Sequence, residues 1–125
     1  MLFRSPSLLL PADGAVFTLG NATVTLQWSA VGTLNSNEAY RITVEDITEG
    51  EGRKLVDEVS STTFSVPASF RATTNVPHIY RWSVVPVRQV GTDESGNIIW
   101  DSAGSVSETR VFTWVSETGA ATPEP

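Results

Sequence analysis

The sequence predicts an all-β fold, an antiparallel two-sheet sandwich of about seven strands. Apolar residues alternate with polar ones along several short segments, which is the pattern of a strand with one buried face. Residues typical of turns separate these segments, as they do in sandwiches and barrels. No stretch of about eleven residues carries helical periodicity. With 125 residues, of which 40% are hydrophobic, the chain is long enough to bury a core of its own.

Four predicted strands lie in the N-terminal half of the chain. The first is the leucine run at 8–10, a short candidate that Pro11 breaks. The segments at 24–28 (VTLQW) and 39–46 (AYRITVED) alternate clearly, so both are predicted to be half-buried strands. The segment at 54–59 (KLVDEV) is a weaker candidate.

The C-terminal half supplies the remaining strands, at 62–66 (TTFSV), 80–87 (YRWSVVPV) and 110–114 (RVFTW). Residues 87–100 have the pattern of a hairpin, with a glycine-containing turn between two short apolar segments. Pro86 cannot donate to a strand ladder, so we expect a bulge there, or the point at which the strand leaves the centre of the sheet.

The inward-facing residues share one parity within each segment, and six of them are aromatic. Each aromatic ring would bury about 150–250 Å² in the core, so the alternation favours a core role for these six over an exposed ligand platform. Their indole N–H and phenol groups are expected to reach a backbone carbonyl or the sheet rim. The predicted core consists of Val24, Leu26, Trp28, Tyr40, Ile42, Val44, Phe64, Val66, Tyr80, Trp82, Val84, Phe112 and Trp114.

Three motifs resemble the fibronectin type III family, namely LQW at 26–28, YRITV at 40–44 and YRWSV at 80–84. That family places a Trp near the end of its second strand, a Tyr in its third and a Tyr-x-x-x-Val run in its sixth. The ending, from Gly96 to VFTW at 111–114, is similar to that of fibronectin-III-like repeats in bacterial surface and secreted proteins. The resemblance implies a sandwich domain at 1–115. The Thr, Pro and Glu composition of 116–125 predicts a linker or disordered tail.

Charge and composition exclude several classes of partner. The net charge of −6 argues against nucleic acid and against an anionic membrane surface, because both require clustered Lys and Arg. No apolar run approaches the roughly 20 residues that span a bilayer, so no direct membrane insertion is expected. The chain has no cysteine, which removes disulfides and thiolate metal sites.

No catalytic, metal or cofactor site is predicted. His78 is the single histidine, no Gly-x-Ser-x-Gly elbow accompanies it, and a loop or strand-edge position is the expected one. Glu45 and Asp46 are adjacent, so on a strand they would face opposite sides and could not act as an acid–base pair. The acidic loop at 45–51 is interpreted as a solvated hairpin. Calcium bound by that loop is the alternative, although neither it nor 93–97 matches the EF-hand spacing.

Arginines on the outward faces of the predicted strands are candidates for cross-strand ion pairs. Arg81, Arg88 and Arg110 could each pair with Glu45 or Glu108, which is a structural role. Framing of a carboxylate-bearing ligand by the same three arginines is the alternative.

The candidate contact surface is Ile98 with Trp100, beside the predicted acidic turn. Either these two or Ile99 must face outward, so an apolar contact patch can form there. Packing of Trp100 over the open end of the sandwich is the alternative.

From the fold, the resemblance and the lack of a predicted catalytic site, we expect a non-catalytic spacer or interaction module of a larger extracellular or cell-surface protein. Its partners would be neighbouring domains or another surface protein. A polysaccharide-binding module using Trp100 and nearby loops is the second hypothesis.

Overall fold

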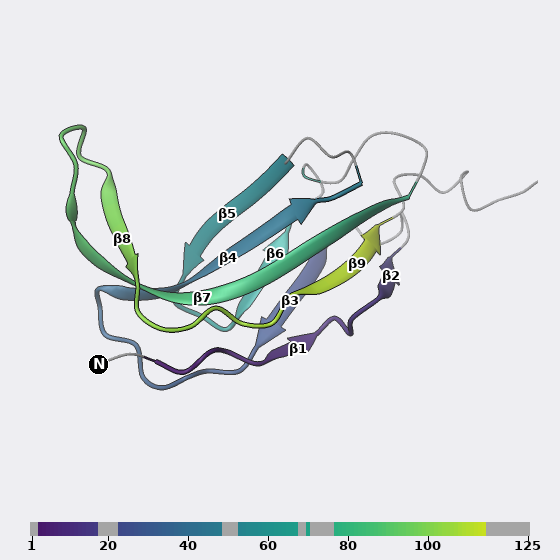
Figure 1. Ribbon diagram of the computed structural model, residues 1–125, viewed down its shortest axis with the longest axis horizontal. Coiled ribbons are helices and arrows are strands. Elements are labelled where there is room, and N and C mark those ends of the chain that lie inside the picture. The colour runs from purple at the N-terminus through teal and green to yellow at the C-terminus, as the bar shows by residue number, and fades with distance from the viewer. Residues whose placement is uncertain (1–2, 18–22, 49–52, 68–69, 71–76, 115–125) are drawn as a thin grey trace, which may run out of the picture.

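The chain folds into two β-sheets packed against each other, as the computed structural model shows (Figure 1). The structure describes residues 3–17, 23–48, 53–67, 70 and 77–114, so the predicted tail at 116–125 lies outside it. The strands are β1 (Leu8–Leu10), β2 (Ala15–Phe17), β3 (Val24–Trp28), β4 (Glu38–Asp46), β5 (Arg53–Val59), β6 (Thr63–Val66), β7 (His78–Thr92), β8 (Ile98–Ser102) and β9 (Arg110–Trp114). The described residues contain no α-helix.

The smaller sheet has the order β1-β3-β6 and is antiparallel throughout. Its register brings apolar residues of the predicted core opposite one another, with Leu26 facing Phe64 and Val24 facing Val66. Because paired residues lie on the same face of a sheet, these side chains together form one apolar wall of the sandwich.

The larger sheet has the order β2-β9-β7-β4-β5, and β8 extends it along the far part of β7. All of its pairs are antiparallel except β2 with β9, which is parallel. A three-stranded sheet thus faces the strand row β5-β4-β7-β9, and the prediction of a two-sheet all-β sandwich is confirmed.

The strands number nine rather than about seven, and β2 is the strand that the sequence pattern did not indicate. The chain leaves the smaller sheet at Pro11 and joins the larger one at Ala15. Two hydrogen bonds fix this crossing on β9: the Gly14 N–H donates to the carbonyl of Val111 (2.8 Å), and the Val111 N–H donates to Oδ1 of Asp13 (2.9 Å). Gly14 has a φ of +87°, which a residue without a Cβ adopts at no steric cost.

Aromatic rings fill the space between the sheets. Tyr80 stacks on Phe112 with ring centroids 5.3 Å apart, and Trp114 meets Tyr80 edge-on at 6.1 Å. At the other end of the core Trp28 contacts Tyr40 at 5.7 Å. All the predicted core residues are buried except Phe64. Phe64 is half-buried because β6 is the outer strand of the smaller sheet, where the facing sheet covers it incompletely.

The polar atoms of these rings differ from the prediction. The Tyr40 hydroxyl accepts a hydrogen bond from the Val31 N–H (3.1 Å), as expected of a buried phenol. The buried Nε1 atoms of Trp28 and Trp82, in contrast, have no hydrogen-bond partner within the described part of the chain. Both indoles point between the sheets, whereas the strand carbonyls lie in the sheet planes and accept from neighbouring strands.

Pro86 does not sit at a bulge, contrary to one of the two predicted possibilities. It pairs with Tyr40 within a continuous β7, and the register shift falls later, between Gln89 and Gly91. Its carbonyl accepts from the Ala103 N–H (2.8 Å), so its own nitrogen faces the same side, between the ends of β9 and β8. Pro86 therefore lies where β7 exchanges one neighbour for another and no ladder donor is required.

We expect Trp82→Ala to destabilise the domain by about 3–5 kcal/mol, because it removes a buried ring from a core that cannot collapse around the space. Ile79→Ala on the same strand is the matched control, since Ile79 is exposed. Denaturant unfolding measures both free energies. Equal midpoints for the Trp82 variant and the unmodified protein would contradict the inward placement of Trp82.

Candidate functional site

The candidate surface is a β-hairpin arm that projects from one end of the sandwich (Figure 1). It consists of β8 and the part of β7 from Val87 onward, which pair antiparallel. At its root, β7 still contacts the rest of the larger sheet, because Glu38 of β4 pairs with Arg88 and the Gln89 N–H donates to the carbonyl of Asn37. Beyond these contacts the arm is two-stranded.

The tip of the arm is a tight turn held by its own hydrogen bonds. The Asp93 N–H donates to the Asn97 carbonyl (2.9 Å), and this hydrogen bond closes a three-residue loop. Gly96 is the left-handed residue of that loop, with a φ of +86°. Oδ1 of Asp93 accepts from the N–H groups of Asn97 (2.9 Å) and Ser95 (2.8 Å). These donors stabilise the carboxylate and hold the pKa of Asp93 below its ordinary value. The carboxylate of Asp93 therefore accepts its hydrogen bonds from within the turn and helps to hold the turn together.

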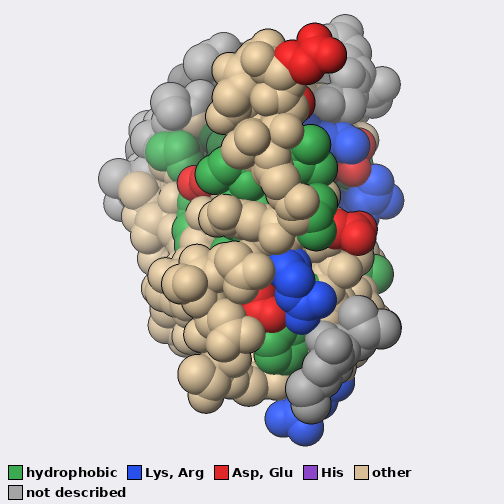
Figure 2. Space-filling view, turned by 90° about the vertical axis from the view of Figure 1, so that its left-hand side faces the viewer, with side chains coloured by type: hydrophobic (Ala, Val, Ile, Leu, Met, Phe, Trp, Pro, Cys, Tyr) green, Lys and Arg blue, Asp and Glu red, His purple; other side chains and the backbone are tan. Residues whose placement is uncertain are grey.

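Apolar side chains are exposed on both faces of the arm. Ile98 and Ile99 point to opposite faces of β8, yet they are 47% and 44% exposed, and Val90 at the bulge is 59% exposed. Trp100 is half-buried. We expected only one face to point outward, and that expectation is wrong because the arm extends past both sheets. In Figure 2, which views the molecule from the end with the arm, hydrophobic side chains are visible on both sides of it.

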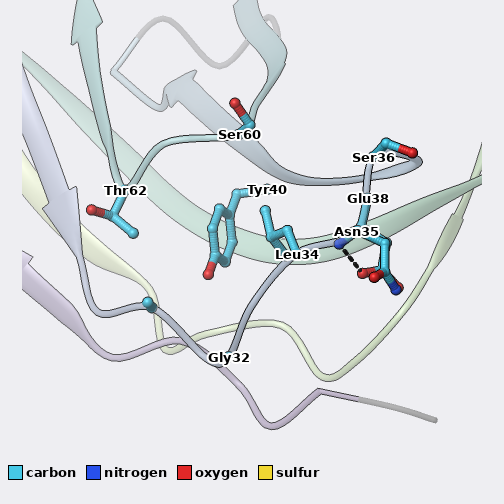
Figure 3. A pocket seen from close by; sticks show the side chains of 9 residues that line it. Gly32, Leu34, Asn35, Ser36, Glu38, Tyr40, Ser60 and Thr62 are labelled. Carbon is cyan, nitrogen blue, oxygen red and sulfur yellow. Dashed lines mark hydrogen bonds between the residues drawn. The ribbon is translucent and has the colours of Figure 1, made fainter.

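A shallow pocket lies at the same end, beneath the loops that follow β3 and β5 (Figure 3). Its volume is about 490 Å³, and its wall combines the edge of the Tyr40 ring and Leu34 with several hydroxyl groups and one amide. The lining residues are Ala30, Gly32, Leu34, Asn35, Ser36, Glu38, Tyr40, Ser60 and Thr62.

Glu38 joins the pocket to the root of the arm. Its Oε1 accepts from the Asn35 N–H (2.8 Å), and its Oε2 accepts from both Nε (3.0 Å) and Nη2 (2.8 Å) of Arg88. The Asn35 amide first, and the Arg88 guanidinium second, hold the pKa of Glu38 below its ordinary value. The carboxylate is nearly inaccessible, so it anchors the arm rather than offering a free charge to a ligand.

All three arginines that were candidates for cross-strand ion pairs form ion pairs, but only those of Arg81 and Arg88 join two strands. Arg81 Nη2 lies 2.7 Å from Oε1 of Glu45, and Arg110 Nε lies 3.1 Å from Oε2 of Glu108. Arg88, in contrast, takes Glu38, a residue that the sequence pattern did not single out.

His78 and Asp46 are not where the sequence pattern placed them. The expected loop or edge histidine is 1% exposed, and Asp46, which was assigned to a solvated acidic loop, is fully buried. Nδ1 of His78 lies 2.7 Å from Oδ2 of Asp46, and Nη1 of Arg53 lies 3.5 Å from the same oxygen. The parity of β4 explains this arrangement, because Asp46 continues the inward series of Tyr40, Ile42 and Val44. Glu49 and Glu51, in the same acidic loop, lie outside the described residues.

An Asp–His pair is also part of a hydrolytic triad, but this pair is sealed inside the sandwich. A substrate cannot reach an imidazole that is 1% exposed. The guanidinium of Arg53 lies over the ring of Phe70, with its carbon 4.6 Å from the ring centroid. The cluster of His78, Asp46 and Arg53 is therefore a structural network of polar contacts.

The described residues contain neither a cluster of His, Asp or Glu side chains suited to a metal ion nor a helix long and apolar enough to cross a membrane. Calcium binding by the loop at 45–51 stays a prediction, because residues 49–51 lie outside the described residues. At 93–97 the Asp93 carboxylate accepts hydrogen bonds from the turn itself.

The chain is similar to solved structures that contain fibronectin type III domains. The FN1–FN3 domains of chicken CNTN1 are 18% identical in sequence with a TM-score of 0.46, and the match covers 91% of this chain and 35% of that one. A Fn3-like protein from Clostridium thermocellum is 16% identical with a TM-score of 0.43, and the match covers 91% of this chain and 95% of that one. No protein-family model matches the sequence, and no curated protein matches it significantly.

The lowered pKa of Glu38 predicts an acid-sensitive contribution to stability. A carboxyl group with a lowered pKa in the folded state stabilises the fold above its ordinary value of 4.5, and that contribution is lost as the pH falls through the lowered pKa. Glu38→Gln should therefore be less stable than the unmodified protein at neutral pH, and the two should converge as the pH falls. Denaturant midpoints measured against pH test this prediction. Glu94→Gln, at an exposed position, is the control, and parallel curves for the Glu38 variant would contradict the assignment.

Proposed function

We propose that the chain is a non-catalytic interaction module of a larger extracellular or cell-surface protein, and that the β7–β8 arm makes its contacts. The observation that carries the proposal is the exposure of Ile98, Ile99 and Val90 on a single projecting element. Scattered apolar residues on a surface need no explanation, whereas a group of them at the end of an arm marks a contact site.

Pre-organisation of the arm supports the same proposal. The Asp93 turn and the Glu38–Arg88 pair hold the tip and the root, so a partner does not have to order a flexible loop when it binds. Ordering costs of this kind subtract directly from binding affinity, and a rigid apolar arm avoids them. The extracellular or surface location rests on the resemblance of the sequence motifs to modules of secreted and surface proteins.

The test is a photo-cross-linking experiment on the full-length protein in the cells that make it. A benzoylphenylalanine in place of Ile98 should cross-link to a partner at the cell surface, in a product that external protease digests. The matched control places the same residue at Val56, which is 47% exposed on the edge strand β5. Equal products from both positions, or products protected from external protease, would contradict the proposal.

Polysaccharide binding is the second candidate, and one specific observation favours it. The half-buried Trp100 and the pocket with hydroxyl and amide groups lie at the same end of the sandwich. An indole face with polar groups nearby is a common arrangement for stacking on sugar rings and hydrogen bonding to them.

For the polysaccharide candidate, we expect saturable binding on a glycan array that Trp100→Ala abolishes and Val56→Ala leaves unchanged. The reason is that only the first variant removes the stacking ring. Absence of binding to any glycan, or binding that survives Trp100→Ala, would reject this second candidate.

A further inference from the structure

The outer edge of β8 is a free strand edge, and we propose that it pairs antiparallel with β8 of a second copy of this chain. The inference rests on the proposed function, since it names the partner that the arm contacts. In the described structure β8 pairs with β7 alone. A strand edge presents a row of unpaired N–H and C=O groups, which is a template for another strand.

The other edge strands of the molecule are protected in ways that β8 is not. β5 contains four charged residues, β2 has only three residues, β1 lies between Pro6 and Pro11, and β6 is followed by Pro67. Charges, prolines and short length are the devices that prevent edge-to-edge pairing. β8 reads IIWDS, with no Lys, Arg or Pro and one acidic residue near its end. Pairing is thus disfavoured at these edges and left open at β8.

The hydrogen bonding of the arm identifies which groups of β8 are free. The Gln89 N–H points toward Asn37, so the backbone of its neighbour Arg88 points toward β8 and meets Asp101. Backbone groups alternate along a strand, and therefore those of Ile99 and Asp101 face β7 while those of Ile98, Trp100 and Ser102 face outward. The outward N–H of Ser102 donates to its neighbour's carboxylate, Oδ1 of Asp101 (2.9 Å). The N–H and C=O groups of Ile98 and Trp100 are left for a partner strand.

One register satisfies these groups in both copies at once. With a two-fold axis beside Ile99, Ile98 of each copy lies opposite Trp100 of the other, and both have outward-facing backbone groups. Ile99 then meets Ile99, and Asn97 meets Asp101. Every apolar residue of β8 faces another apolar residue, on both faces of the ribbon, and no like charges are directly opposed. A register centred on Trp100 would instead set Ile99 against Asp101.

The expected dimer is weak and is strengthened by salt. A pair of five-residue strands buries little area compared with a standard interface. Each copy also carries a net charge of −6, and the repulsion between copies is screened as ionic strength rises. Weak pairing of this kind becomes effective where many copies are held close together, because tethering raises their effective concentration.

Cysteine scanning tests the register directly, since the natural chain has no cysteine. In the proposed dimer the two Ile99 residues form a non-hydrogen-bonded pair with Cα atoms about 4.5 Å apart, which a disulfide can bridge. Ile99→Cys should therefore become a covalent dimer when oxidised glutathione takes up the two electrons. Ile98→Cys is the register control, because it faces Trp100 of the other copy. Val56→Cys, at an equally exposed position on β5, is the surface control, and both controls should stay monomeric.

Sedimentation of the cysteine-free protein completes the experiment. The dimer fraction should rise with concentration and with salt, and Ile99→Lys should abolish it by opposing two charges across the axis. A monomer at all concentrations, or equal cross-linking of all three cysteine variants, would overturn the self-pairing. In that event a surface partner cross-linked from position 98 would still support the proposed function, so the two failures are distinguishable.

Discussion

The structure depends on β7 keeping one alternation of buried and less buried residues from His78 to Pro86. From Tyr80 to Val84 its inward side chains fill the centre of the core, where Tyr80 contacts Phe112 and Trp114 of the neighbouring strand. The same strand pairs with β4 on one side and with β9 and then β8 on the other. A slip of one residue would turn the aromatic rings to solvent and break all three pairings together, so the register of β7 is strongly determined.

The arm is a consequence of that same strand. β7 pairs with β9 only as far as Trp82, and with β4 as far as Arg88, so its remaining residues have β8 as their neighbour. The ion pair between Glu38 and Arg88 lies at the last position where β7 pairs with β4. One part of β7 therefore packs in the core, and the part that follows it forms the arm. The direction of the arm is set by the packing of β7 in the core.

The alternation of apolar and polar residues was sufficient to predict the sandwich. A strand that is buried on one face has an apolar residue at every second position, and this pattern is visible in the sequence. The same alternation places Asp46 on the inward face of β4, so it could have predicted that this carboxylate is buried. We interpreted Asp46 as solvent-exposed because its buried partner, His78, is 32 residues away along the chain. The exposed faces of Ile98 and Ile99 were beyond the pattern, since alternation cannot indicate that a hairpin extends past both sheets. The short β2 was missed for a similar reason: three residues carry no period, and its parallel partner β9 lies at the other end of the sequence.

The crossing of the N-terminal segment into the larger sheet also has a mechanical consequence. β2 lies parallel to β9, with Ala15 beside Phe112 and Phe17 beside Trp114. A tension applied to the chain on the N-terminal side of β2 and on the C-terminal side of β9 would draw these two strands past each other along their length. Their hydrogen bonds would then be loaded in shear and share the force, instead of opening one after another as in a zipper. This small parallel pair is placed as a clamp against stretching.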